Sequence, residues 1–477
     1  MTAADPACFM RRDSSLASQP LRVAIFGAGP SGFYAAEELL KQSERVVTVD
    51  LFDRLPTPYG LVRGGVAPDH QKIKTVTRQF EKVAQRPGFR FFGNVCFGTD
   101  LTLDEVLAHY HQVLFATGAE SGRRMGIPGE DLPGSYPATA FVAWYNGHPD
   151  SRRSQFNFST VERIAIVGNG NVALDVARIL TRAVDELSPS DMASYAVEAL
   201  RKSTVKEIYV LGRRGPAQAA FTSPELRELT ELTGVDLVVR PGDLALDALS
   251  QEFLAQSTAE PTHQRNMEIL TGQIAKGEGS HARKIRLHFL VSPVSVLGTS
   301  RVEGVRIEKN FLRKDERGNL KAQGTGVYEE LPCQMIFRAI GYKGRRLAGV
   351  PFDERAGIIP NRAGRVIDPT SATPMPRIYV AGWVKRGPSG VIGTNKADAH
   401  ATVTAMLADA RQHLLSSEVW SDPETISTLL TRKRVRYVTF TGWQRTDQIE
   451  LARGKKLGKA RDKLTTIEEL LEAAEAA

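Results

Sequence analysis

Two stretches of the chain share one order of hydrophobic and polar positions. The first, "VAIFGAGPSGFYAAEELL", starts at residue 23, and the second, "IAIVGNGNVALDVARIL", spans residues 164–180. Each opens with a short apolar run, passes through closely spaced glycines and continues with apolar residues three or four positions apart. This order predicts a β-strand, a tight turn and an α-helix. A unit of this kind holds the pyrophosphate of a dinucleotide, so the pattern predicts two such sites.

The first unit carries the spacing GxGxxG directly after its strand. Gly27 permits a tight turn, Gly29 lets a pyrophosphate approach the backbone, and Gly32 lets the helix pack closely on the strand. The next apolar segment, "VVTVDLFD", predicts a second strand that ends at Asp53, 26 residues beyond Gly27. A carboxylate at this place accepts hydrogen bonds from an adenosine ribose, which strengthens the prediction of a dinucleotide site. The alternative is that Asp53 is a solvated strand end.

The second unit differs at its third glycine and at the end of its second strand. Residues 168–173 match GxGxxA, with Ala173 in place of the third glycine. After a polar stretch, "VKEIYVLG" predicts the next strand, which ends in Arg213 and Arg214 and not in a carboxylate. Guanidinium groups pair with a 2′-phosphate that a carboxylate would repel, so this site is predicted to select NADPH. The alternative is an exposed basic turn.

Two more apolar segments predict where the chain passes between the units. "QVLFATGAES" (112–121) and "MIFRAIGYKG" (335–344) each predict a strand that ends in a small residue and glycine. We therefore expect an α/β fold of two Rossmann-like dinucleotide-binding domains, in which an NADP-binding domain (119–334) is inserted into a discontinuous FAD-binding domain (21–118 and 335–477). The outer domain would hold a permanent FAD and the inserted domain an exchangeable NADPH. Two sites are needed because hydride leaves the nicotinamide at one and arrives at the flavin at the other.

The composition limits the chemistry that the chain itself supplies. Its 477 residues are 42% apolar and 24% charged, as in ordinary globular proteins, and exceed the usual size of one domain. The three cysteines, Cys8, Cys96 and Cys333, form no CxxC pair, which argues against a redox dithiol and against a cysteine-ligated cluster or zinc. The nine histidines show no HExxH spacing, so no metal site is predicted. Redox chemistry must come from a bound organic cofactor.

The net charge and the N-terminal segment add little to the prediction of function. The net charge of +8 is compatible with nucleic acid, an anionic surface or an acidic protein, and no nucleic-acid-binding motif accompanies it. No apolar run reaches the roughly 18 residues that cross a bilayer. Residues 1–20 lack the apolar core of a secretory signal and are predicted to be a disordered tail. We expect a cytoplasmic protein; Arg11 and Arg12 leave a transit peptide and the mitochondrial matrix as the alternative.

Five longer motifs resemble a single family. They are, in order, "PTPYGLVRGGVAPDHQKIK", "FVAWYNGHPD", "GNGNVALDVARIL", "GRRGPAQAAFTSPELREL" and "GWVKRGPSGVIGTNKADA". Together they closely resemble the adrenodoxin-reductase-like family of ferredoxin–NADP+ reductases, from about residue 21 to the C-terminal region. The resemblance implies FAD and NADPH as cofactors, and a monomer. It also implies that hydride passes from NADPH to FAD, which then gives single electrons to a ferredoxin, an adrenodoxin-type iron–sulfur protein.

The resemblance also implies which residues bind the two cofactors. Those that match the family's FAD contacts are Ser31, Asp53, Leu61, Val95, Trp383, Gly390, Val391 and Ile392. Those that match its NADPH contacts are Arg123, Asn169, Gly170, Asn171, Val172, Arg213, Arg214 and Glu225. Gly390 is expected to serve both cofactors, and Arg124 is the alternative to Arg123.

Two segments add chemistry to these assignments. Trp383 follows the apolar strand "RIYVAG", and small residues lead from it into the helix "TNKADAHATVTAML". The amino end of that helix is expected to face the flavin and stabilise its reduced, anionic form, while core packing is the alternative for Trp383. "GLVRGGVAPDH" has no regular period and predicts a loop that covers a ligand. Its His70 is the catalytic candidate, as a proton relay to the reduced flavin or an acceptor contact, with a structural histidine as the alternative.

An acidic ferredoxin, of the 2Fe–2S type, is the partner that the resemblance implies, docked on a basic surface. The candidates for that surface are Arg201, Lys202, Lys206 and Arg227, of which Arg227 resembles a docking position of the family. Such charges steer the encounter of two proteins more than they raise affinity. The alternative for each is a solvated helix face, as it is for the basic C-terminal segment "ARGKKLGKARDKL".

Two other functions are compatible with the sequence. One is an NADPH-dependent flavin enzyme that reduces a small molecule such as a quinone or a dye. The other is a flavoprotein that senses redox state without catalysis, against which the intact "GWVKRGPSGVIGTN" argues. Disulfide reductases are excluded because they need CxxC. Bleaching of a bound flavin by NADPH separates enzyme from sensor, and electron delivery to a ferredoxin separates the two enzymes.

Overall fold

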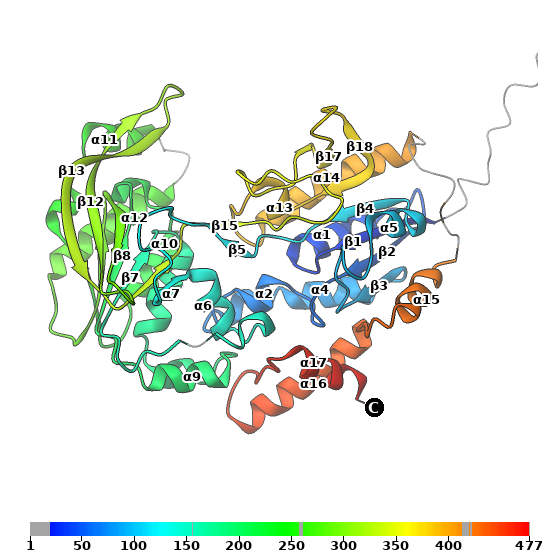
Figure 1. Ribbon diagram of the computed structural model, residues 1–477, viewed down its shortest axis with the longest axis horizontal. Helices are drawn as coiled ribbons and strands as arrows, with labels where there is room; N and C mark the ends of the chain where they lie inside the picture. Colours follow the sequence, from blue (N-terminus) through cyan, green and yellow to red (C-terminus); the bar gives the residue numbers. More distant parts are fainter. Residues whose placement is uncertain (1–19, 155, 257–260, 413–418, 420–421, 477) are drawn as a thin grey trace, which may run out of the picture.

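A computed structural model describes residues 20–154, 156–256, 261–412, 419 and 422–476, so all but the last residue of the tail expected over 1–20 lies outside the described residues. The chain forms two lobes that lie side by side (Figure 1). One is built on a seven-stranded sheet and the other on a six-stranded sheet, and we call them the seven-stranded lobe and the six-stranded lobe. None of the described helices is both long and apolar enough to cross a membrane.

The seven-stranded sheet is mainly parallel and contains the first glycine unit. Its strands lie in the order β16 (Asn361–Arg362), β17 (Arg365–Ile367), β18 (Pro374–Val380), β4 (Gln112–Phe115), β1 (Leu21–Phe26), β2 (Val47–Phe52) and β3 (Phe89–Phe92). All pairs from β18 to β3 are parallel, and the edge strands β16 and β17 are antiparallel. Every residue of β1 is buried, and all except Arg22 are apolar. Parallel strands that are covered on both faces need such a largely apolar sequence.

Helices cover both faces of this sheet. Val23 and Ile25 of β1 point into one core, and Ala24 and Phe26 point into the other. The first core contains α1 (Pro30–Leu39), α4 (Thr77–Ala84), α14 (Thr394–Arg411), α16 (Phe440–Lys456) and α17 (Ile467–Glu475). The second contains α5 (Leu103–His109) and α15 (Thr425–Arg432). Three short helices lie in loops that follow β2 or β18, namely α2 (Leu61–Gly64), α3 (Gln71–Lys74) and α13 (Trp383–Arg386).

The six-stranded sheet is parallel throughout. Its strands lie in the order β6 (Ser135–Pro137), β14 (Met335–Arg338), β7 (Arg163–Val167), β8 (Glu207–Leu211), β10 (Arg283–His288) and β9 (Val235–Val239). One face packs on α6 (Ala138–Tyr145), α7 (Asn171–Thr181), α9 (Ser194–Arg201), α10 (Ser223–Thr230) and α12 (Pro261–Lys276). The other helical segments of this lobe are α8 (Val184–Leu187), α11 (Ala248–Gln256), η2 (Pro149–Ser151), η3 (Pro216–Gln218) and η4 (Pro241–Leu244).

A three-stranded antiparallel sheet covers the other face of the six-stranded sheet. It consists of β11 (Val291–Leu297), β12 (Gly304–Lys314) and β13 (Leu320–Pro332). Ala165 and Val167 of β7 share a core with Val305 and Ile307 of β12. The six-stranded lobe therefore has three layers: helices, a parallel sheet and an antiparallel sheet.

Two short strands carry the chain between the lobes. β5 (Ser121–Gly122) pairs antiparallel with β15 (Tyr342–Lys343), and we call this pair the crossing ribbon (Figure 1). β14, which precedes β15, is hydrogen-bonded into the six-stranded sheet. Residues 335–338 therefore pair with the segment that was expected to be inserted, and we place the return crossing after Arg338 and not at residue 334. The division into two domains, with this boundary, stays a prediction.

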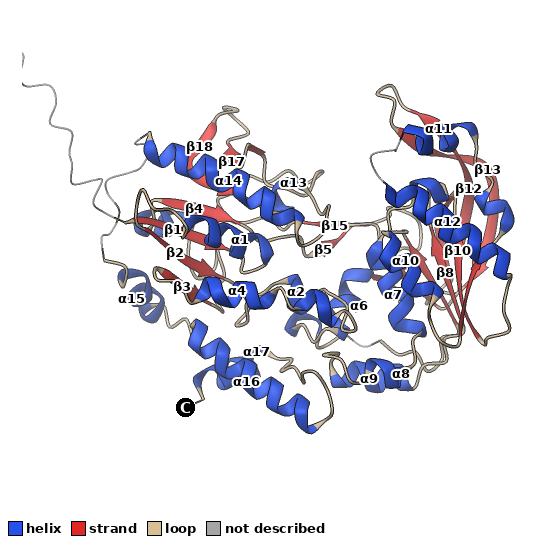
Figure 2. Cartoon of the chain, turned by 180° about the vertical axis from the view of Figure 1, so that it is seen from behind, coloured by secondary structure: helices blue, strands red, loops and turns tan. Residues whose placement is uncertain are grey.

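The C-terminal helices α16 and α17 lie beneath the seven-stranded lobe, and the loop between them approaches α9 of the other lobe (Figures 1 and 2). Lys459 Nζ donates to Met192 O at 2.8 Å, and Ala460 N donates to Pro189 O at 2.7 Å. The C-terminal region thus contacts both lobes.

Candidate dinucleotide sites and the contact between them

The first glycine motif turns sharply between β1 and α1. Gly27 has a φ of +110°, and a Cβ atom there would collide with the carbonyl oxygen of Ala116. Gly32 is equally enclosed, because its Cβ would collide with the carbonyl of Gly27. At Gly29, by contrast, the nearest heavy atom to a Cβ is Gly60 Cα, at 3.9 Å. The first and third glycines are needed for strand and helix to pack, and the second leaves its backbone open to a ligand.

Asp53 closes one side of this motif. Its Oδ2 accepts a hydrogen bond from Ala28 N at 2.8 Å, and its Oδ1 accepts one from Leu55 N at 2.9 Å. Burial raises the pKa of Asp53 to about 6, against the lowering effect of these two bonds. Val95 N donates to Asp53 O at 2.8 Å, so two residues expected to bind FAD are in direct contact.

The segment after β18 lies against α1, through Ser31, and beside the crossing ribbon, through Trp383. Ser31 Oγ donates to Asn395 Oδ1 at 3.1 Å, which joins α1 to the first turn of α14. Trp383 begins α13, and its Nε1 donates to Ser389 O at 3.2 Å. The Trp383 ring lies 5.7 Å from the ring of Tyr342 in the crossing ribbon. The tryptophan is half-buried beside the point where the chain changes lobes.

The remaining residues expected at the FAD site lie in the loops before α2 and α14. Leu61 begins α2 and is half-buried. Gly390 has a φ of +78°, and a Cβ there would lie 2.6 Å from Thr394 Oγ1, so the turn into α14 by itself accounts for this glycine. Val391 is 60% exposed, and Ile392 packs against the core of the seven-stranded lobe.

The second glycine motif repeats the geometry of the first. Gly168 has a φ of +118°, and a Cβ there would collide with the carbonyl oxygen of Ala339 at the end of β14. A Cβ at Gly170 would have no neighbour within 4 Å. As in the first motif, the first glycine serves the turn and the second leaves its backbone accessible to a ligand.

Two polar atoms near the second motif are buried without a hydrogen-bond partner among the described residues. They are Asn169 Nδ2 and Glu225 Oε2. Burial raises the pKa of Glu225. Asn171 is occupied, because its Oδ1 accepts a hydrogen bond from Thr222 N at 2.8 Å, and Val172 packs on the core of this lobe. The two orphaned atoms belong to residues expected to bind NADPH, and polar groups of a ligand would satisfy them.

Arg213 and Arg214 follow β8 without an acidic partner. Arg213 is exposed and Arg214 is half-buried, and neither guanidinium pairs with a carboxylate in the part of the chain that the structure describes. Burial and the neighbouring charge of Arg213 lower the pKa of Arg214. Two adjacent cations without a counterion fit the 2′-phosphate of NADPH, which would neutralise both.

The two lobes meet at His70, in the loop that precedes α3. His70 Nε2 lies 2.8 Å from Glu228 Oε2 on α10, and His70 Nδ1 lies 4.0 Å from Asp175 Oδ1 on α7. The adjacent Asp69 accepts hydrogen bonds from Arg178 of α7 at 2.8 and 3.0 Å. Arg178 also pairs with Asp175 at 2.8 Å and with Glu228 at 3.2 Å. We call these five residues the interlobe cluster.

The members of the interlobe cluster shift one another's pKa. Burial lowers the pKa of His70, but the hydrogen bond to Glu228 and the charges of Asp175 and Asp69 together outweigh burial, and the net pKa is raised. The same bond lowers the pKa of Glu228. Burial would raise the pKa of Asp69, but Arg178 lowers it to about 2. Asp69 is therefore ionised at neutral pH, while His70 keeps its proton to a higher pH than an ordinary histidine.

The side chains of Arg123 and Arg124 both have partners within the protein. Arg123 N donates to Gly341 O at 3.0 Å, and its Nη2 donates to Ala356 O at 3.0 Å. Arg124 Nη2 pairs with Asp131 at 2.6 Å on the surface. The structure places the expected NADPH arginine beside the crossing ribbon, with its guanidinium bound to a backbone carbonyl.

The four docking candidates lie at two different edges of the six-stranded lobe. Arg201 ends α9, Lys202 follows it and Lys206 precedes β8, so these three lie toward the amino end of the parallel strands. The exposed ion pairs there are Arg201–Asp185 at 3.4 Å and Lys206–Glu162 at 2.6 Å. Arg227 lies on α10, beyond the carboxyl end of β8 and next to Glu228. Only Arg227 of the four adjoins the interlobe cluster in the described structure.

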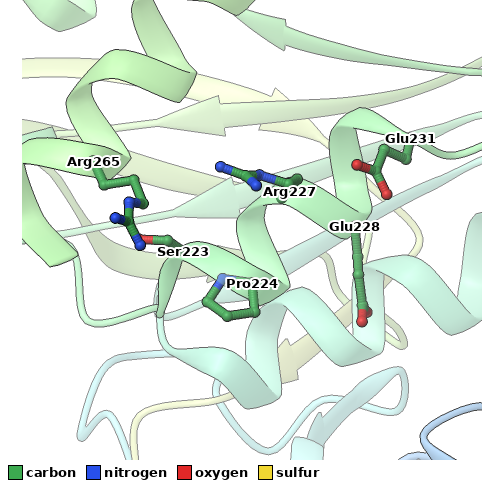
Figure 3. A pocket seen from close by; sticks show the side chains of 6 residues that line it. All are labelled: Ser223, Pro224, Arg227, Glu228, Glu231 and Arg265. Atoms are coloured by element: carbon green, nitrogen blue, oxygen red, sulfur yellow. The ribbon is translucent and has the colours of Figure 1, made fainter.

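A hollow of about 280 Å³ opens beside the interlobe cluster, between α10 and α12. Its lining residues are Ser223, Pro224, Arg227, Glu228, Glu231 and Arg265 (Figure 3). Arg227 and Arg265 are exposed, and neither pairs with a carboxylate among the residues described. Glu228 points away from both guanidinium groups (Figure 3). The hollow therefore offers two free cations next to the place where the lobes meet.

His70 was expected from the sequence, but the four other residues of the interlobe cluster were not. Asp175 and Arg178 are three positions apart in α7, a spacing that puts them on one helix face and was a usable signal. Asp69 directly precedes His70 in the quoted loop. The contact across the lobes had no local signal, since 109 residues separate Asp69 from Arg178 and 158 separate His70 from Glu228. Among the described residues, no group of three or more His, Cys, Asp or Glu could hold a metal ion.

The known proteins that this chain is similar to over nearly its whole length are NADPH-dependent reductases of ferredoxin or adrenodoxin. The model of the family described as pyridine nucleotide-disulphide oxidoreductase matches residues 21–236. The chain is 43% identical to the NADPH-ferredoxin reductase FprA of Mycobacterium tuberculosis, over 95% of this chain and 99% of that protein. It is 42% identical to the mitochondrial NADPH:adrenodoxin oxidoreductase of Arabidopsis thaliana, over 97% of each. The solved structure of Mycobacterium tuberculosis FprA in complex with NADPH matches with a TM-score of 0.89 at 42% identity, covering 96% of this chain and 100% of that chain.

Proposed function

This chain belongs to the adrenodoxin-reductase-like family of ferredoxin–NADP+ reductases, and from that premise we propose that it transfers electrons from NADPH through FAD to a ferredoxin. Bound FAD supplies the central chemistry, because it takes a pair of electrons as hydride from NADPH and releases them one at a time. The protein contributes binding, orientation and charge. An acid–base group is not needed for hydride transfer itself, which depends on the two rings being held in contact.

The observation that carries this function is a pair of open glycine motifs on two lobes that touch. Gly29 and Gly170 each present an accessible backbone at the end of a parallel strand, and the segments after the neighbouring strands β2 and β8 touch through His70 and Glu228. Ligands of open α/β sheets bind at the carboxyl ends of the strands. Two dinucleotides bound at these motifs would extend toward one place between the lobes.

We assign the FAD side to the seven-stranded lobe. The open backbone at Gly29 accepts the pyrophosphate, and Asp53 is placed to accept hydrogen bonds from the ribose. Trp383 and the amino end of α14 lie at the lobe boundary, where the isoalloxazine would reach. The α14 amino end, with its positive dipole, would stabilise negative charge on the reduced ring.

We assign the NADPH side to the six-stranded lobe. Arg213 and Arg214 would bind the 2′-phosphate, and the open backbone at Gly170 the pyrophosphate. The orphaned atoms of Asn169 and Glu225 would complete the site. His70 lies between the two assigned sites, and its bond to Glu228 raises its pKa, which supports its assignment as the residue that holds a proton there.

For the partner, we propose that an acidic ferredoxin of the 2Fe–2S type docks at the hollow beside the interlobe cluster. Arg227 and Arg265 are free cations there, whereas Lys206 forms a surface ion pair on another edge. Charge reversal in Arg227→Glu and Arg265→Glu should raise the KM for ferredoxin and weaken its salt dependence, without slowing flavin reduction by NADPH. Lys206→Glu serves as the matched comparison and should leave the KM for ferredoxin unchanged. We retain a cytoplasmic monomer as the expected state.

An anaerobic stopped-flow experiment tests the proposed route in two steps. Mixing NADPH with the purified holoprotein should bleach the flavin absorbance, and subsequent mixing with an oxidised 2Fe–2S ferredoxin should restore it while the ferredoxin spectrum changes to the reduced form. Bleaching without reoxidation by ferredoxin would favour a small-molecule acceptor. Absence of bleaching would contradict an NADPH-dependent enzyme.

A further inference from the structure

A buried carboxylate of the six-stranded lobe lies between two ammonium groups of the seven-stranded lobe. Asp191, in the loop between α8 and α9, accepts from Lys74 Nζ at 2.7 Å through each carboxylate oxygen. Lys463 Nζ lies 2.9 Å from Asp191 Oδ2, and Gln71 Nε2 donates to Oδ1 at 3.0 Å. The exposed fractions are 11% for Lys74, 7% for Asp191 and 1% for Lys463. We call Lys74, Asp191 and Lys463 the ammonium clamp.

Lys463 also binds backbone groups of both lobes. Its Nζ donates to Arg63 O in α2 at 3.1 Å and to Asn146 O, at the end of α6, at 3.1 Å. Its own segment is anchored to α16, because Leu464 N donates to Glu450 Oε1 at 2.9 Å. Lys463 is therefore fixed in the seven-stranded lobe and reaches into the other.

The clamp is continuous with the place where the two sites meet. His70 is the residue before α3, and Lys74 is the last residue of that helix. A displacement of Lys74 relative to Asp191 therefore moves the loop that carries Asp69 and His70. Further links between the lobes include the crossing ribbon, the Asp69–Arg178 and His70–Glu228 pairs, and the hydrogen bonds of Lys459 and Ala460 to the loop before α9. Two lobes joined by a short covalent ribbon are free to rotate unless contacts elsewhere fix their angle.

We propose that Asp191, held between Lys74 and Lys463, is a positioning residue that sets the angle between the lobes and thereby aligns the nicotinamide with the flavin. The inference rests on the proposed function, because it assumes that the two lobes carry these two nucleotides. With the carboxylate present, one acid from the opposite lobe pairs with both buried lysines and offsets one of their two positive charges. Without it, the cations face each other in a region that excludes water, and the lobes separate to let solvent reach them.

A purely structural role and a positioning role predict different results. A structural ion pair affects the temperature at which the protein unfolds, but leaves the geometry of the folded holoprotein unchanged. A positioning residue changes the alignment of the two rings in protein that is fully folded and fully loaded. Because a misplacement of about 1 Å can slow a reaction about 100-fold, the rate of flavin reduction is a sensitive readout of alignment.

The test compares wild-type holoprotein with Asp191→Asn, and uses Asp185→Asn as the matched control. Asp185 lies in the neighbouring α8 and its side chain is 90% exposed. Three quantities are measured at equal FAD content: the maximal rate of flavin reduction by NADPH, the long-wavelength charge-transfer absorbance of the reduced enzyme with NADP+, and the radius of gyration from small-angle X-ray scattering.

We expect Asp191→Asn to slow flavin reduction by about 10- to 100-fold, to weaken the charge-transfer band and to increase the radius of gyration. Asp185→Asn should match wild type in all three. If Asp191→Asn keeps the wild-type band, radius and a rate within about twofold, the proposal is overturned. If Asp191→Asn fails to load FAD, the same three measurements are made on Lys463→Met, a variant that leaves Asp191 with one cation. Wild-type values for Lys463→Met would then overturn the proposal. Failure of NADPH to bleach the wild-type flavin would instead refute the proposed function, while the scattering comparison would still test the clamp.

Discussion

Arg178 donates two hydrogen bonds to Asp69 across the boundary between the lobes, from Nε at 2.8 Å and from Nη2 at 3.0 Å. The side chains are 1% and 5% exposed. Arg178 lies in the helix that follows the second glycine motif, and Asp69 lies in the loop that carries His70. One ion pair thus connects the loop of His70 to the helix of the second glycine motif, and loss of either partner leaves a buried charge unpaired.

This pair predicts a loss of stability in acid. Because Arg178 lowers the pKa of Asp69 to about 2, the carboxylate contributes stability that is complete above its ordinary pKa of about 4 and is lost as the pH falls toward 2. Asp69→Asn should lower the unfolding temperature at neutral pH by about 5–10 °C and flatten its decline in that acid range. Differential scanning calorimetry across this pH range measures both effects. Parallel curves for variant and wild type would contradict an ionised, stabilising Asp69.

The bond between His70 and Glu228 predicts a shift in the titration of His70. Glu228 raises the pKa of His70 above the value that burial alone would give, so Glu228→Gln should lower it. The stability contributed by the charged pair is complete below the ordinary pKa of histidine and is lost as the pH rises through the raised pKa. NMR titration of the His70 ring, assigned with His70→Gln, measures the shift. Glu231→Gln, at the residue that follows the same helix, is the control and should leave the titration unchanged.

The unpaired arginines after β8 predict selectivity between NADPH and NADH. Each charge-assisted hydrogen bond to the 2′-phosphate contributes about 1.5–3 kcal/mol, so Arg214→Ser should raise the KM for NADPH by about 10- to 100-fold. The KM for NADH, which lacks that phosphate, should change little. Arg240→Ser, at a surface arginine paired with Asp243, is the control. Equal effects of Arg214→Ser on both nucleotides would place the phosphate elsewhere.

Replacement by alanine is predicted to have different effects at two glycines of the first motif. At Gly27 it should prevent folding, and at Gly29 it should prevent FAD binding. Gly27→Ala introduces a collision with the Ala116 carbonyl at a φ of +110°, so this variant should not fold into a stable seven-stranded lobe. Gly29→Ala has room for its methyl group in the free protein and should fold, but should lose FAD because the methyl group occupies the face left for the pyrophosphate. Circular dichroism and the flavin absorbance of the purified proteins distinguish the two. A folded, yellow Gly29→Ala would contradict the assigned FAD position.

The fold class and the function were predicted from short contiguous motifs, and both are confirmed. Strand, glycine turn and helix follow one another in the chain, so a local pattern is enough to specify them. The core of a buried parallel strand such as β1 is likewise visible as the apolar run Val23–Phe26, although the strand itself begins two residues earlier and includes Arg22. The site residues read from these motifs, among them Gly29 and Gly170, stay predictions that the geometry supports.

Features that depend on the packing of distant segments were not visible in the sequence. The partners of His70 and the ammonium clamp join residues more than a hundred positions apart, and no local periodicity encodes such a meeting. The domain boundary drawn at residue 335 stays a prediction, and the sequence did not show that β14, which begins there, is hydrogen-bonded to β7 of the six-stranded sheet. Arg123 matched a family position by sequence, but its side chain is held by the carbonyl of Ala356.

The central claim is that electrons pass from NADPH through this protein to a ferredoxin, and steady-state reduction of cytochrome c tests it most directly. The rate is measured with NADPH or NADH, each with and without a purified 2Fe–2S ferredoxin. We predict a large increase on addition of ferredoxin, and a much higher rate with NADPH than with NADH. A rate that no ferredoxin increases would contradict the proposed acceptor, and equal rates with the two nucleotides would contradict the role assigned to Arg213 and Arg214.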